Sequence, residues 1–130
     1  MARTLSTNDL IGLAEAEGIT VEWHPSGPKG MWMPTRRAIS IRYGLSDEQT
    51  RCTLAHELGH AYYGHPAGHD AQYERDAWRY AARLLISPED YAAAERVYGP
   101  EPRIIAAQLG VTQYLVGVWS QMWQTKRAAA

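Results

Sequence analysis

Apolar residues recur with two different periods along the chain, and the helical period predominates after about residue 46. Before that point Ile19, Val21 and Trp23 alternate with polar residues, which is typical of a half-buried β-strand. Two further short apolar segments follow, at residues 31–33 and 38–41. Because the three segments lie close together in the sequence, we expect them to form a small three-stranded antiparallel sheet.

Helix start and stop signals divide the rest of the chain into helices. Ser46 followed by Gln49 is a capping-box pattern, and Ser87-Pro88 places a proline at the first position of a helix. One more helix is expected ahead of the strands. The predicted helices cover residues 9–17, 47–63, 70–86, 88–98, 104–109 and 112–123.

The predicted fold class is α+β, with the small antiparallel sheet packed beside a helical bundle. The length of 130 residues suits a single domain with one modest core. We expect that domain to span residues 1–125, of which residues 101–124 form a helix-turn-helix-like C-terminal part. Residues 126–130 are predicted to be a disordered tail.

Charge and cysteine content narrow the classes of function. The formal net charge is −1 and the basic residues form no long block, so nucleic-acid binding through bulk electrostatics is not indicated. The single cysteine, Cys52, excludes an intrachain disulfide and is predicted to be a buried, unreactive thiol. No apolar run reaches the ~20 residues that a membrane span needs. We therefore expect a cytoplasmic protein without a membrane partner.

The sequence His56-Glu57-Leu58-Gly59-His60 has the spacing of a zinc-hydrolase motif. Residues four apart lie on one helical face, so His56 and His60 can present two imidazoles to one ion. Glu57 lies beside them and can take a proton from a water molecule that the ion activates. The motif fixes only three positions, so it also occurs in helices that bind no metal. Here it lies within a capped helix with apolar neighbours, which favours the metal site.

A catalytic zinc ion needs a third protein ligand and an open position for water. The downstream candidates are His65, His69, Asp70, Glu74 and Asp76. Glu74 is the best placed of them, because a hairpin of two helices can bring the first turns of the next helix over the motif. Asp76, with a shorter side chain, is its rival.

The C-terminal part admits two interpretations. Residues 104–118 have the small apolar residues and the central glycine of a helix-turn-helix. The second helix, however, has no Lys or Arg between Gln113 and Trp123, and it would hold DNA phosphates poorly. We expect a packing unit or a protein-docking surface, and direct nucleic-acid binding is not expected.

Two blocks of this sequence resemble the ImmA/IrrE family of metallopeptidases. The first is the A-H-E-L-G-H stretch at residues 55–60. The second and more specific block, residues 74–88, matches the family pattern E-x-x-A-x-x-(aromatic)-A-x-x-L-L-x-P. Two departures are visible: Ser87 intervenes before the proline, and Trp78 replaces a small polar residue. We expect neither to touch a metal ligand, so both bear on helix packing.

The resemblance, which covers roughly residues 5–120, implies a function. It implies that His56, His60 and Glu74 bind Zn²⁺ and that Glu57 is the general base of a hydrolase. Family members of this size are typically phage or mobile-element proteins that cleave a helix-turn-helix repressor and so relieve repression. The alternative is a module of the same fold that binds a repressor or antitoxin without cleaving it. A purely structural zinc site is disfavoured, because only three good ligands are evident and none is a cysteine.

Overall fold

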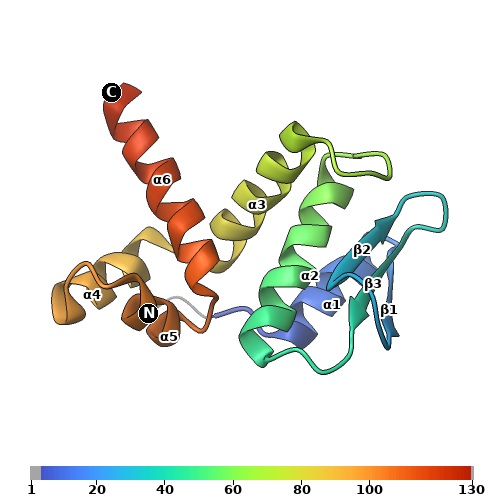
Figure 1. The fold of residues 1–130 in the computed structure, drawn as a ribbon, viewed down its shortest axis with the longest axis horizontal. Coiled ribbons are helices and arrows are strands. Elements are labelled where there is room, and N and C mark those ends of the chain that lie inside the picture. Colours follow the sequence, from blue (N-terminus) through green and yellow to red (C-terminus); the bar gives the residue numbers. More distant parts are fainter. Residues whose placement is uncertain (1–3, 130) are drawn as a thin grey trace.

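A three-stranded sheet and a set of helices share one hydrophobic core in the computed structural model, which describes the backbone of residues 4–129 and the side chains of residues 4–124. Figure 1 shows the sheet beside α1 and α2, while α4 and α5 lie at the opposite end of the molecule. The elements in chain order are α1 (Thr7–Ala16), β1 (Thr20–His24), β2 (Gly30–Met33), β3 (Ala38–Arg42), α2 (Asp47–Tyr62), α3 (Ala71–Leu85), α4 (Pro88–Tyr98), α5 (Pro102–Leu109) and α6 (Gln113–Ala129).

The sheet is mixed, so the prediction of an all-antiparallel sheet is wrong. The strand order is β1-β3-β2, with β3 parallel to β1 and antiparallel to β2. β3 takes the central place because its residues Ala38 to Ile41 are all buried, whereas β1 and β2 are partly exposed. The chain crosses from β1 to the far edge of the sheet through residues 25–29. The imidazole of His24 supports this crossing, since its two nitrogens lie 2.6 Å from Ser40 Oγ and 2.6 Å from the Pro28 carbonyl oxygen.

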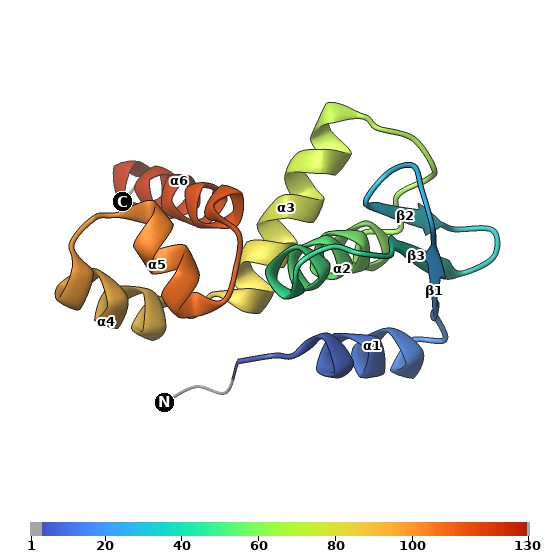
Figure 2. The same ribbon diagram turned by 60° about the horizontal axis from the view of Figure 1, so that its bottom comes forward.

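Helix α2 lies at the centre of the fold. Its N-terminus has the predicted capping box, in which Ser46 Oγ accepts from the Gln49 amide and the Gln49 side chain accepts from the Ser46 amide. Residues Arg51 to His60 are buried without interruption. This burial follows from contacts on several sides, since α2 packs against α1, α3, β2 and β3. Figure 2 shows α2 between α3 and the sheet.

Among the C-terminal helices, α6 packs against α3 and α5, and α5 packs against α4. α5 ends at Gly110, whose φ of 68° and ψ of 34° give the left-handed turn that leads to α6. Leu115, Val116 and Trp119 of α6 are buried in the core. The backbone of α6 continues to Ala129, through four of the five residues assigned above to a disordered tail, and residue 130 lies outside the described residues. No helix among the described residues is long and apolar enough to cross a membrane.

Candidate metal centre

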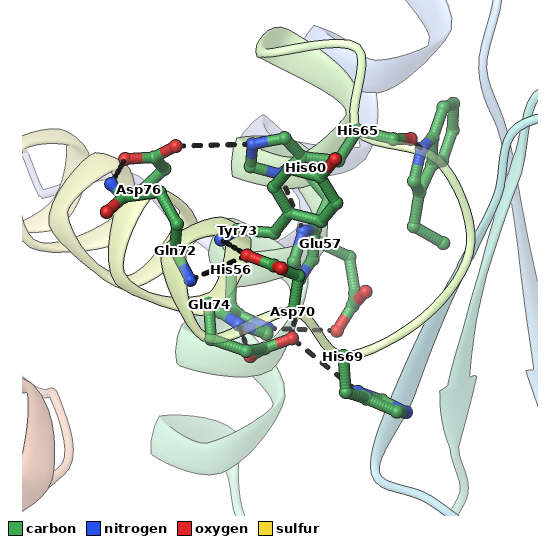
Figure 3. A network of polar contacts seen from close by, with 11 residues as sticks. His56, Glu57, His60, His65, His69, Asp70, Gln72, Tyr73, Glu74 and Asp76 are labelled. Atoms are coloured by element: carbon green, nitrogen blue, oxygen red, sulfur yellow. Dashed lines mark hydrogen bonds and ion pairs between the residues drawn. The ribbon is translucent and has the colours of Figure 1, made fainter.

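Two histidines of α2 and one glutamate of α3 meet at the centre of the site. His56 and His60 are buried, with ring centroids 4.7 Å apart and ring planes at 78°. The Nε2 atom of His56 lies 2.8 Å from Glu74 Oε2, and the Nε2 atom of His60 lies 3.2 Å from Glu74 Oε1. Figure 3 shows the glutamate reaching the imidazoles from the neighbouring helix. Spacing along one helix thus pairs the histidines, and the α2–α3 hairpin adds the carboxylate.

The position of Glu74 follows from how α3 begins. Asp70 caps this helix, because its Oδ1 accepts hydrogen bonds from the amides of Gln72 and Tyr73. Glu74 therefore lies in the first turn of α3. Further along, Gly59 of α2 packs directly on the backbone of Ala77, which holds the two helices close together. These two features place the Glu74 carboxylate over the histidine pair.

The donor set suits a zinc ion. Two ligand atoms that each lie about 2.0–2.1 Å from a tetrahedral ion are separated by roughly 3.3 Å. The two nitrogen–oxygen separations at Glu74, 2.8 and 3.2 Å, are close to that value. Imidazole nitrogen and carboxylate oxygen are also the atoms that zinc commonly takes in catalytic sites. A small shift of side chains would let His56, His60 and Glu74 share one ion.

Glu57 forms part of the same cluster but faces a different atom. Its Oε2 lies 3.0 Å from Nδ1 of His56, on the other side of that ring from Glu74. Ligand atoms of His56, Glu57 and His60 all lie within 4.8 Å of one another, which also makes this buried trio a candidate metal-binding group. Glu57 is buried against β2, where Gly30 leaves the space that its carboxylate occupies. The structure thus places the Glu57 carboxylate beside the histidines, at a different nitrogen of His56 from the one that Glu74 contacts.

The carboxylates of the site raise the pKa values of its histidines, and burial lowers them. Burial lowers the pKa of His56, but the Glu57 and Glu74 carboxylates outweigh it, and the net pKa is raised above 6.5. Burial and the neighbouring His56 lower the pKa of His60. Burial raises the pKa of Glu74, but the two histidines outweigh it and the net pKa falls below 4.5. Near neutral pH, Glu74 is ionised and His60 is neutral, as metal ligands must be.

The other downstream candidates lie further from the centre. His65 Nδ1 is 2.9 Å from His60 Nδ1, and Asp76 Oδ2 is 3.4 Å from His65 Nε2, so both lie behind His60. The exposed His69 reaches Glu74 at 3.6 Å, and Asp70 is occupied in capping α3. Of the five candidates, Glu74 alone contacts Nε2 of both motif histidines in the described structure.

Trp78 does contact a motif histidine, so the expectation that it concerns only helix packing is wrong. Its indole stacks on the His56 ring, with centroids 4.1 Å apart and planes at 28°. Trp78 follows Glu74 by four residues and so lies on the same face of α3. That spacing is visible in the sequence and could have indicated the contact.

Two adjoining cavities border the histidines, and the sequence indicated neither. One, of about 610 Å³, lies between α2, Trp78 and the start of α6, where Thr112 and Tyr114 form part of its wall. The other, of about 360 Å³, lies between the β2 strand and the loop that joins α2 to α3. Both are lined by Gly30, His56 and Glu57. The two cavities, called the cleft below, share His56 and Glu57, and the smaller one also reaches His60.

A histidine pair on one helix, with a glutamate between them and a second carboxylate from the next helix, defines a metallopeptidase-like site of the HExxH type. The family model described as the IrrE N-terminal-like domain (Peptidase_M78) matches residues 14–117. The chain therefore belongs to the M78 peptidase, or ImmA/IrrE, family, as the sequence blocks above indicate. No curated protein sequence matches the chain significantly.

Proposed function

We propose that this protein is a zinc-dependent endopeptidase in which His56, His60 and Glu74 hold the ion and Glu57 is the general base. The observation that carries the proposal is the convergence of Glu74 on the Nε2 atoms of both histidines, with Glu57 buried beside them. Two carboxylates at one histidine pair serve two roles. One completes the ligand set, and the other remains available for proton transfer.

Zinc held by these residues would polarise the peptide carbonyl and lower the pKa of a water molecule. Glu57 then accepts the proton of the attacking water and passes it to the leaving amine. Its place on the wall of both cavities gives it access to the whole length of the cleft. Trp78 covers one face of His56 and excludes water from that side of the site.

The cleft favours an extended peptide as substrate. β2 is an edge strand, so one side of its backbone is free to pair with another strand. All four of its residues, Gly30–Met33, line the smaller cavity together with the histidines. A peptide that added to this edge would pass directly over His56 and His60. An unfolded or linker segment of a protein meets this requirement, whereas a folded surface does not.

The larger cavity favours a bulky side chain next to the cleaved bond. Trp78 and Tyr114 form an edge-to-face pair on its wall, with centroids 4.9 Å apart. Such a pair offers aromatic contact surface to an apolar side chain. Because Thr112 and Tyr114 face this cavity, the start of α6 is turned to the peptide cleft. This arrangement supports a role of the helix-turn-helix-like part in protein rather than DNA contact.

The substrate we propose is a helix-turn-helix transcriptional repressor, whose cleavage would relieve repression in a phage or mobile element. Support for this target comes from the resemblance of residues 55–60 and 74–88 to the ImmA/IrrE blocks. The same chemistry would act on any extended segment that fits the cleft. Cleavage of the repressor tests the target, and the loss of that cleavage in variants of the site tests the chemistry.

The test mixes the zinc-loaded protein with the repressor encoded beside it and follows cleavage on a gel and by mass spectrometry. We expect a single new pair of fragments from the wild type and none from Glu57→Gln, which keeps the proposed ligands. Glu74→Gln should lose both cleavage and zinc. Cleavage that persists in Glu57→Gln would contradict the general-base assignment. A stable complex without cleavage would instead favour the non-cleaving binding module.

A further inference from the structure

His65 is a buried histidine outside the HExxH motif, and it is held from several sides. Its ring stacks on Tyr73 of α3, with centroids 4.4 Å apart and planes at 24°, and on Tyr63 at 5.6 Å. Its backbone carbonyl accepts a hydrogen bond from Trp32 Nε1 of β2 at 3.0 Å. Only 5 % of the residue is exposed. A loop residue fixed in this way has a defined ring orientation.

The two nitrogens of His65 face two different groups. Nδ1 lies 2.9 Å from Nδ1 of His60, and Nε2 lies 3.4 Å from Oδ2 of Asp76. Asp76 is itself held, since its Oδ1 accepts a hydrogen bond from Gln72 Nε2 at 2.8 Å. Asp76, His65, His60 and Glu74 therefore form a continuous polar chain from α3 through the loop to α2 and back to α3 (Figure 3).

The positions of the protons follow from this geometry once Nε2 of His60 binds the metal, because that lone pair then faces the ion and the His60 proton lies on Nδ1. Two neutral imidazole nitrogens 2.9 Å apart need one proton between them, so one donates and the other accepts. If His65 carried its proton on Nδ1, its Nε2 lone pair would face the Asp76 carboxylate, which is repulsive. The favourable arrangement has His65 protonated on Nε2, toward Asp76. His65 Nδ1 then accepts the Nδ1 proton of His60, and the His60 Nε2 lone pair is left for the ion that Glu74 would share.

We propose that His65 and Asp76 are positioning residues that fix the tautomer and ring orientation of His60 for metal binding. The inference rests on the proposed role of His60 as a ligand and adds the residues that support it. A ligating histidine usually donates its second N–H to a carboxylate, a carbonyl or water, and this partner tunes metal affinity. Here His65 occupies that place, and the Asp76 carboxylate is the next group in the hydrogen-bonded chain, in contact with His65. His65 is thus a partner of the ligand His60 and is not itself a ligand.

The test measures zinc affinity by chelator competition in the full-length protein. We expect His65→Leu to weaken zinc binding by about 10- to 100-fold, because it leaves the His60 N–H buried without an acceptor. His65→Asn places an amide oxygen near the former Nδ1 and should recover most of the affinity. Asp76→Asn keeps the ring in place and should weaken binding by about tenfold. Asp90→Asn, a change of charge in the first turn of α4, is the matched control and should leave affinity unchanged.

Two further measurements separate positioning from packing. The visible spectrum of the cobalt-substituted protein should change in His65→Leu and stay close to wild type in His65→Asn. In the zinc-loaded wild type with ¹⁵N-labelled histidine, NMR should show His65 protonated on Nε2. Thermal unfolding identifies a variant that does not fold. If His65→Leu does not fold, Asp76→Asn tests the positioning role, since the Asp76 side chain lies at the edge of the site.

The outcomes are distinguishable. Unchanged zinc affinity in both His65→Leu and Asp76→Asn, or a His65 ring protonated on Nδ1, overturns the inference while the proposed function stands. An equal loss in His65→Leu and His65→Asn with no effect of Asp76→Asn also overturns it, because packing alone would explain that result. A wild type that binds no zinc overturns the proposed function and this inference together.

Discussion

Gly59 of α2 lies directly against the backbone of Ala77 in α3. A Cβ atom on Gly59 would come within 2.8 Å of the Ala77 carbonyl oxygen and 2.9 Å of its Cα. Both separations are far below ordinary van der Waals contact, so a larger residue requires the helix backbones to move apart. Glu74 lies one turn before Ala77 on α3. The same contact therefore sets how closely the Glu74 carboxylate approaches His56 and His60.

Gly59→Ala should separate the two helices and weaken the metal site. We expect a loss of stability of about 1–3 kcal/mol from overpacking. Zinc affinity should fall by at least about tenfold, because Glu74 moves away from the histidine pair. Thermal unfolding of the metal-free protein measures the first effect, and chelator competition measures the second.

Gly117→Ala is the matched control. Gly117 lies within α6, and among the described residues no atom outside its chain neighbours and its own helix backbone lies within 4 Å of the Cβ it would gain. The change should stabilise the helix by about 0.5–1 kcal/mol and leave zinc affinity unaltered. If Gly59→Ala behaved in the same way, the contact with Ala77 would not govern the position of Glu74.

The helices and the pairing of His56 with His60 could be predicted because their signals are local. The Ser46–Gln49 capping box and the four-residue spacing of His56 and His60 depend on neighbours along one helix. Glu74 was favoured as the third ligand because two consecutive predicted helices can form a hairpin, which brings the start of the second helix over the motif. Local signals also gave the helix limits to within two residues, except at the end of α6, which continues to Ala129 and not to residue 123.

Strand order and the cleft could not be predicted in this way. No local signal determines whether β2 or β3 is central, because that depends on which strand packs against α2 and the core. The contact of Gly30 with Glu57 joins residues far apart in sequence, and it appears only once β2 lies on α2. The pairing of His65 with Asp76 likewise requires the path of the α2–α3 loop.

Gly30→Ala should impair catalysis more than metal binding. The added Cβ would lie 2.5 Å from Thr53 Cγ2 and 3.0 Å from Glu57 Oε2, so it displaces the proposed general base. We expect kcat to fall by about 100-fold, the effect of a misplacement of about 1 Å at a reacting group. Zinc content should remain at the wild-type level, because Gly30 does not contact Glu74. Steady-state kinetics and metal analysis of the same preparation check this.

The double variant Gly30→Ala/Thr53→Ser separates the two clashes. The serine lacks Cγ2, so the shorter contact is relieved while the contact with Glu57 remains. Thermal stability should recover and kcat should stay low. Full recovery of kcat would show that displacement of the strand, rather than of Glu57, limits the single variant.

Trp78→Ala should reduce both stability and turnover. The indole stacks on His56, contacts Tyr114 and forms part of the wall of the larger cavity. Loss of a large, half-buried aromatic side chain should destabilise the protein by about 2–4 kcal/mol. kcat/KM for the proposed substrate should fall by at least about tenfold, because the aromatic wall of the cavity is lost.

Trp78→Phe tests which property of the side chain is needed. It keeps an aromatic face against His56 and should retain most of the stability and kcat/KM. A variant with phenylalanine as defective as the alanine variant would mean that the full size of the indole, and not its ring stacking, is required.

Zinc binding should release one proton from His56 in the neutral pH range. The pKa of His56 is raised above 6.5, because the Glu57 and Glu74 carboxylates outweigh burial, whereas His60 is already neutral and Glu74 already ionised. Zinc affinity should therefore rise about tenfold per pH unit from pH 6.5 up to the raised pKa and level off above it. Calorimetry in buffers of different ionisation enthalpy counts the released proton.

The same linkage fixes how zinc changes stability with pH. In the metal-free protein, the interaction of protonated His56 with the carboxylates contributes stability that is fully present below pH 6.5 and is lost as the pH rises through the raised pKa. Zinc binding instead strengthens over that range, so the gain in Tm on adding zinc should increase as the pH rises from 6.5 through the raised pKa of His56. Glu57→Gln removes one of the carboxylates that raise the pKa of His56, and its proton release should shift to lower pH. A Tm gain that shrinks as the pH rises would contradict the assignment of His56 as a ligand.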